Sequence, residues 1–101
     1  MMMKIIEFEP QFWELYQQGE QLYLSIAIDV SSVVSCWDMV LTQAEIEAYQ
    51  NFGRTALVEL TKTLVNDVFR GNFSRLESNL VSADQKRAMQ ITFKNWQNSQ
   101  S

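Results

Sequence analysis

The side chains that suggest a function in this chain lie on one face of a predicted sheet. Two carboxylates, Glu14 and Asp38, share that face with tyrosines from neighbouring strands. Tyrosines interleaved with acids suit a protein-binding surface, because aromatic side chains anchor a partner and charges steer its approach. The alternatives are a plain solvated face and a face covered by a helix. The candidate contact residues are Glu14, Tyr16, Tyr23, Ser25, Asp29 and Asp38.

Residues for catalysis or metal binding are scarce. The chain has no histidine and one cysteine, Cys36, which is expected in mid-strand opposite Ala27 as a small, partly buried hydrophobe. Histidine is the commonest general base and metal ligand. Neither GxxxxGK nor GxGxxG occurs, so no glycine loop is expected to hold a phosphate. We therefore expect no catalytic residue, no metal and no cofactor. An enzyme that works through carboxylates alone would need a deep pocket enclosing two of them with raised pKa values.

The charge is divided unevenly along the sequence. Residues 1–50 hold eight acids and one base, whereas residues 51–101 hold seven bases and four acids, for a total of −4. Such asymmetry indicates a surface that meets a charged partner. Because the acidic half would repel phosphate, nucleic acid is not the expected partner.

Length and composition indicate one domain over residues 1–101, with a polar, frayed tail from residue 98. The most apolar window, residues 22–40, is interrupted by serines and aspartates, so no membrane span is expected. The single cysteine rules out an internal disulfide, and the start of the chain has no apolar stretch typical of a signal peptide. We expect a cytoplasmic protein.

Alternating apolar residues predict a meander of three or four strands. The strands are expected over residues 4–9, 22–29 and 33–41, and residues 11–18 fit either a fourth strand or a short helix. We favour the strand, because a Gln18-Gly19 turn would pair Leu15 with Leu22 and place the apolar residues on one side. A Ser31-Ser32 loop pairs Ser25 with Asp38 by the same reasoning.

After residue 41 the period becomes helical. Thr42-Gln43-Ala44-Glu45 is a capping box that opens a helix to about Arg70, within which Gly53 marks a break or a close approach to the sheet. Further caps are predicted at Ser74 and Ser82. The order of elements predicts an α+β fold, an antiparallel β-meander with two or three α-helices packed on one sheet face. The expected core combines Leu24, Ile26, Trp37, Met39 and Leu60.

The segment 22–64 resembles small bacterial immunity proteins of contact-dependent growth-inhibition and polymorphic toxin systems. The resemblance is carried by Tyr23-Leu24 in one strand, Leu41-Thr42 at the end of another, the acidic helix start at Glu45, and Gly53. It implies tight inhibitory binding to a cognate toxin domain, often a basic nuclease. It transfers no functional residue, because the interfaces of these families diverge.

Two hypotheses follow from these observations. The first is a non-enzymatic immunity protein that neutralises a bacterial toxin through its acidic surface. The second is a small structural or regulatory subunit that acts as a homodimer or larger homo-oligomer, through the apolar sheet face or an edge strand.

Overall fold

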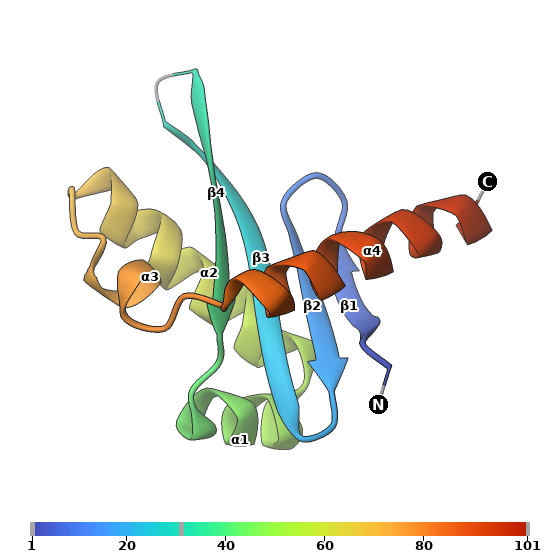
Figure 1. The fold of residues 1–101 in the computed structure, drawn as a ribbon. Helices are drawn as coiled ribbons and strands as arrows, with labels where there is room; N and C mark the ends of the chain where they lie inside the picture. Colours follow the sequence, from blue (N-terminus) through green and yellow to red (C-terminus); the bar gives the residue numbers. More distant parts are fainter. Residues whose placement is uncertain (1, 31, 101) are drawn as a thin grey trace.

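The computed structural model of the chain describes residues 2–30 and 32–100. It has the expected α+β fold, with a four-stranded antiparallel sheet followed by helices (Figure 1). The ambiguous segment contributes a strand from Trp13, and the strand order follows the sequence. The strands are β1 (Lys4–Glu9), β2 (Trp13–Gln18), β3 (Gln21–Val30) and β4 (Val33–Val40).

The two central hairpins differ in how well their registers were predicted. In the β3–β4 hairpin Ser25 pairs with Asp38, as expected, although Ser31 of its turn lies outside the described residues. In the β2–β3 hairpin Leu15 pairs with Leu24 instead of Leu22. The turn is one residue later than predicted, at Gly19-Glu20 instead of Gln18-Gly19, and the positive φ of Gly19, 63°, suits glycine. Because the pairing moves by two positions, every side chain keeps its predicted face.

In the part of the chain that the structure describes, four helices follow the sheet. Thr42 forms the predicted capping box, and Gly53, with a φ of 65°, separates the first two helices. A Cβ added at Gly53 would meet no atom within 4 Å, so the glycine marks a break and not a close approach to the sheet. Ser82 exchanges hydrogen bonds with Gln85 as a second capping box, whereas Ser74 does not cap its helix. The helices are α1 (Gln43–Phe52), α2 (Arg54–Phe69), α3 (Ser74–Ser78) and α4 (Ala83–Gln100). The segment from residue 98 is helical to Gln100, and Ser101 lies outside the described residues.

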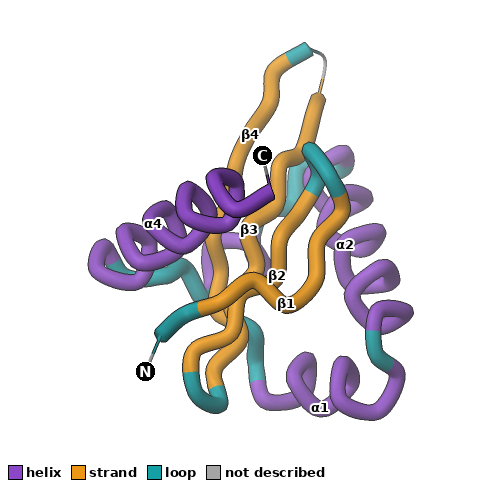
Figure 2. Tube along the Cα trace, turned by 90° about the vertical axis from the view of Figure 1, so that its right-hand side faces the viewer, coloured by secondary structure: helices purple, strands orange, loops and turns teal. Residues whose placement is uncertain are grey.

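The helices cover both faces of the sheet. Figure 2 shows the sheet in section between α2 on one side and α4 on the other. Three helices, α1 to α3, contribute to the larger core on the expected face. The fourth was predicted to join them, but Met89 and Phe93 of α4 pack on the opposite face against Tyr16 and Tyr23. Of the alternatives open from the sequence, the face that carries the tyrosines is therefore the one covered by a helix. Its aromatic rings offer α4 an apolar surface to pack on.

The main core contains most of its predicted members. Leu24, Ile26 and Met39 are fully buried in it, but Trp37 and Leu60 are only partly buried at its margin. Leu57 and Leu64, one helical turn to either side of Leu60 on α2, are fully buried in this core instead. The helix therefore packs on the sheet as expected, through the leucines that flank Leu60.

Candidate functional site

Ion pairs join acidic residues of the first half of the chain to basic residues of the second half. Arg54 lies 2.6 Å from Glu9 and 3.7 Å from Glu7, and Lys86 lies 3.6 Å from Asp38. Arg75 pairs with Glu45. The acidic half is thus partly neutralised by the basic half of the same molecule, and its remaining acids are the ones available to a partner.

A small cleft between the sheet and α4 collects most of the predicted contact residues. Its lining includes Glu14, Tyr16, Ser25 and Asp38, and its volume is about 260 Å³. On the α4 side the cleft is closed by residues that the sequence interpretation did not include, namely Lys86, Met89, Gln90 and Phe93. Residues 89, 93 and 96 form an apolar stripe on the last helix. This stripe could have indicated that the helix packs on a face of the sheet.

The tyrosines of this group are buried below α4. Tyr16 and Tyr23 are 2% and 3% exposed, and the Gln85 side chain donates a hydrogen bond to the Tyr23 hydroxyl at 3.2 Å. While α4 is in place, these rings act as core and not as contact anchors. Asp29 is exposed farther along β3, opposite Val34 and outside the cleft lining.

Burial changes the titration of two cleft residues. Desolvation raises the pKa of the Glu14 carboxyl, the Asp38 charge raises it further, and a 3.4 Å hydrogen bond from the Tyr16 hydroxyl opposes the shift. Burial also raises the pKa of Tyr16, with a smaller contribution from the neighbouring Glu14 carboxylate. These shifts follow from packing under α4. At about 260 Å³ the cleft is also smaller than the ~300–1,000 Å³ usual for ligand sites.

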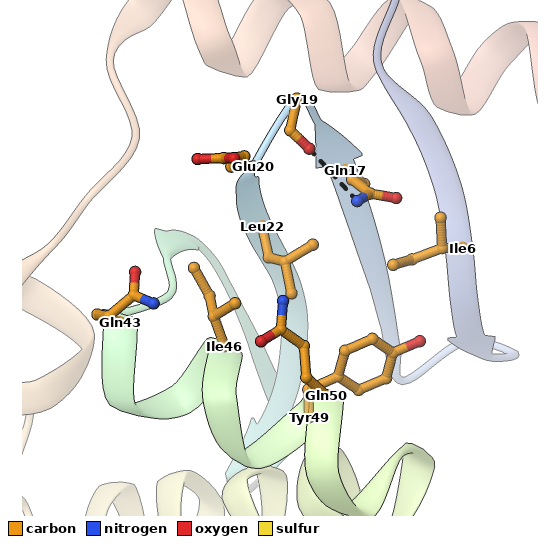
Figure 3. A pocket seen from close by; sticks show the side chains of 9 residues that line it. All are labelled: Ile6, Gln17, Gly19, Glu20, Leu22, Gln43, Ile46, Tyr49 and Gln50. Carbon is orange, nitrogen blue, oxygen red and sulfur yellow. Dashed lines mark hydrogen bonds between the residues drawn. The ribbon is translucent and has the colours of Figure 1, made fainter.

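A larger groove lies between α1 and the β2–β3 turn (Figure 3), with a volume of about 540 Å³. Its apolar lining comes from Ile6, Leu22 and Ile46, drawn from two strands and the helix. Among the described residues that line it, three amide side chains, one carboxylate and one phenol supply the polar groups, and none is a lysine or arginine. These polar residues are Gln17, Gln43, Gln50, Glu20 and Tyr49.

Local structure explains why the groove forms. Gly19 provides the tight turn that brings Glu20 beside Gln17, and the Thr42 capping box starts α1 opposite that turn. The Tyr49 hydroxyl donates to Glu7 at 3.5 Å and ties α1 to β1. Burial, followed by the Glu7 charge, raises the pKa of Tyr49, which keeps this hydroxyl a donor.

The surroundings of the groove are also acidic. Glu20 is exposed, and the exposed Glu47 lies one helical turn from Gln43, whose side-chain amide donates to it at 3.5 Å. Lys4 lies in the adjoining hollow, which Glu20 also lines. The sequence interpretation missed this groove, because its polar residues come from a turn and a helix that are distant in sequence.

The described residues contain no cluster of three or more side chains suited to hold a metal ion. Within the same residues, none of the helices has the length and apolar character that crossing a membrane requires. Comparison of the chain with family models, curated proteins and solved structures finds no match.

Proposed function

We propose that this chain is a cytoplasmic, non-enzymatic protein-binding protein, and specifically an immunity protein that neutralises a cognate bacterial toxin domain. The observation that carries the proposal is the groove between α1 and the β2–β3 turn. It combines an apolar floor, three amides and a carboxylate, and no lysine or arginine is among the described residues of its lining.

The chemistry of the groove suits a basic protein segment. A lysine or arginine side chain can lay its aliphatic part on Ile46 and Leu22 and place its charge beside Glu20. The glutamine amides both donate and accept hydrogen bonds, so they can bind peptide groups on either side of that charge. A basic nuclease domain would present such segments, which agrees with the partner that the resemblance implies.

The groove is a better contact surface than the cleft under α4. In the cleft, Asp38 is already paired with Lys86, and the tyrosines are buried. In the groove, Glu20 is exposed and forms no ion pair within the described residues. A partner therefore meets an unneutralised carboxylate without displacing a helix.

Co-expression with the product of the adjacent reading frame tests the proposal. We expect that product to stop bacterial growth when expressed alone, and this chain to restore growth and to co-purify with it. Glu20→Lys should reduce protection, whereas the same reversal at the exposed Glu77 of α3 should not. If the chain neither protects cells nor binds that product, the toxin assignment fails.

The second candidate function is a homo-oligomeric structural or regulatory subunit. The observation that favours it is the exposed first part of the edge strand β4, which carries no charge from Val33 to Trp37 and where Val33 and Val34 are 65% and 60% exposed. Cys36, which was expected to be partly buried, is also exposed on this strand. The two candidates use different surfaces, so both surfaces can be active in one protein.

A further inference from the structure

Two amide side chains of the groove beside α1 direct a hydrogen-bond donor toward the protein. The Gln17 amide nitrogen donates to the Gly19 carbonyl at 3.3 Å, and the Gln43 amide nitrogen donates to the Glu47 carboxylate at 3.5 Å. Within the described residues, no hydrogen bond reaches the amide oxygen of Gln17 or Gln43. Both side chains can therefore offer an acceptor to a bound group.

The other polar groups of the groove offer acceptors as well. The single proton of the Tyr49 hydroxyl is directed to Glu7 at 3.5 Å, so its oxygen can still accept. Glu20 is exposed, and its carboxylate forms no ion pair within the described residues, although Lys4 lines the adjoining hollow with it. The lining thus presents several oxygen acceptors, one of them charged.

These acceptors surround an apolar centre (Figure 3). Leu22 and Ile46 lie in the middle of the view, with Glu20 and Gln43 on one side and Gln17 on the other. A group bound there rests on aliphatic carbon and meets oxygen atoms from more than one direction. Such a site suits a flat cation that has several donors along its edge.

We propose that the groove binds an arginine side chain of the partner, and that Gln17 and Gln43 select arginine over lysine. This proposal rests on the binding role proposed above for the same groove, and it names the group that the partner places there. A guanidinium is planar, carries five N–H donors and has no acceptor. Its face can lie on Leu22 and Ile46 while its N–H groups reach the surrounding oxygens.

Other side chains match this arrangement less well. The lysine ammonium is compact and strongly hydrated, and its three donors lie at one point. An ammonium beside Glu20 leaves the Gln17 oxygen, on the other side of the apolar centre, to water. A neutral group of the shape of guanidinium, such as the urea group of citrulline, lacks the attraction of the carboxylate. It also brings an oxygen acceptor to a lining that already presents oxygens.

Titration of the isotope-labelled chain with three short peptides tests the proposal by nuclear magnetic resonance. The peptides are N-acetyl-Gly-Arg-Gly-amide and its counterparts with lysine or citrulline in the middle. We expect the arginine peptide to shift the side-chain amide signals of Gln17, Gln43 and Gln50, with a dissociation constant on the order of millimolar. The lysine peptide should bind about fivefold more weakly, which corresponds to the loss of one hydrogen bond. The citrulline peptide should bind more weakly than both.

Two variants separate the role of the carboxylate from that of the amides. Glu20→Gln should weaken both cationic peptides by a similar factor, because it removes the charge that attracts them. Gln43→Ala should weaken the arginine peptide more than the lysine peptide, so that the preference of about fivefold declines. The matched controls are Glu77→Gln on α3 and Gln97→Ala on α4, both exposed and outside the groove lining. Backbone amide signals confirm that each variant is folded.

Three results would overturn the proposal. They are unshifted groove amides with the arginine peptide at about 50 mM, a lysine or citrulline peptide that binds as tightly as the arginine peptide, and an unchanged preference in the folded Gln43→Ala variant. The titration needs no toxin, so its outcome is distinct from that of the co-expression assay. A failed growth assay beside a successful titration would remove the toxin assignment and keep the arginine site.

Discussion

Arg75 of α3 contacts both carboxylate oxygens of Glu45 at the start of α1, and its Nε lies 3.0 Å from Oε2. The same carboxylate accepts the Thr42 amide at 2.8 Å as part of the capping box. One side chain therefore caps α1 and fixes α3 against it. Both partners are largely shielded from water, with side chains 24% and 19% exposed.

Arg75→Ala should lower the free energy of unfolding by about 1–3 kcal/mol, because it leaves the Glu45 carboxylate partly buried without its cation. Urea denaturation at neutral pH measures the change. Arg70→Ala is the control, since Arg70 is exposed and forms no ion pair among the described residues. Equal stability of the two variants would show that the Arg75 contact does not hold the helices together.

Leu64→Ala should cost about 2–5 kcal/mol, because Leu64 is fully buried between α2 and the sheet. Leu60→Ala should cost clearly less, since Leu60 is only partly buried at the edge of the core. Denaturant unfolding of both variants gives the comparison. A larger loss at Leu60 would mean that α2 presents a different face to the sheet.

Glu14→Gln should stabilise the protein at pH 7, because the folded state raises the pKa of Glu14 above its usual 4.5. Between pH 4.5 and that raised pKa the folded state binds more protons than the unfolded state, so wild-type stability falls as the pH rises. The advantage of Glu14→Gln should therefore shrink as the pH falls through this window.

Urea denaturation of wild type and Glu14→Gln at a series of pH values measures this difference. Glutamine keeps an oxygen that can accept the Tyr16 hydroxyl, so the hydrogen bond is not the variable. The exposed Glu77→Gln serves as the control. A Glu14→Gln variant that is less stable than wild type at pH 7 would show that the carboxylate is favoured in the cleft.

Helix α4 should be the least stable of the long elements. Met89 is its only buried side chain among the described residues, whereas α2 buries four, Leu57, Thr61, Leu64 and Val68. Few buried apolar contacts lower the free energy of local opening. Native-state hydrogen exchange should show α4 amides opening at lower free energy than those of α2. Equal protection would indicate that α4 and the sheet unfold together.

The alternation of apolar residues was sufficient to predict the sheet, and the capping residues were sufficient to predict most helix starts. Ser25 and Asp38 pair as predicted because Val30 and Val33 are the last paired residues of the β3–β4 hairpin, so its loop falls at the predicted position. The β2–β3 turn could not be placed to the residue, since moving a two-residue turn by one position changes the partners but keeps the apolar side chains on one face.

The strand sequences alone could not predict that α4 covers Tyr16 and Tyr23. A sheet face that mixes tyrosines with acids can be solvated, bound by a partner or covered by a helix. The outcome depends on the path of residues 71–82, which carry α4 to the far side of the sheet. The groove was missed for the same reason, because Glu20 and Gln43 become neighbours only in the folded chain.

Association kinetics with the product of the adjacent reading frame, measured across a salt series, show whether the groove beside α1 binds that product. Complementary charge mainly raises the association rate, and salt screens that effect. Glu20→Lys combined with Glu47→Lys should therefore slow association strongly at low salt and less at high salt. The exposed Glu77→Lys is the control and should change the association rate little.

A parallel measurement on Glu14→Lys with Asp38→Lys distinguishes the groove from the cleft under α4. We expect the groove variant to slow association at low salt more than the cleft variant does, with both shown to be folded. An unchanged association rate for the folded groove variant, or slower association for the cleft variant alone, would exclude the groove as the interface.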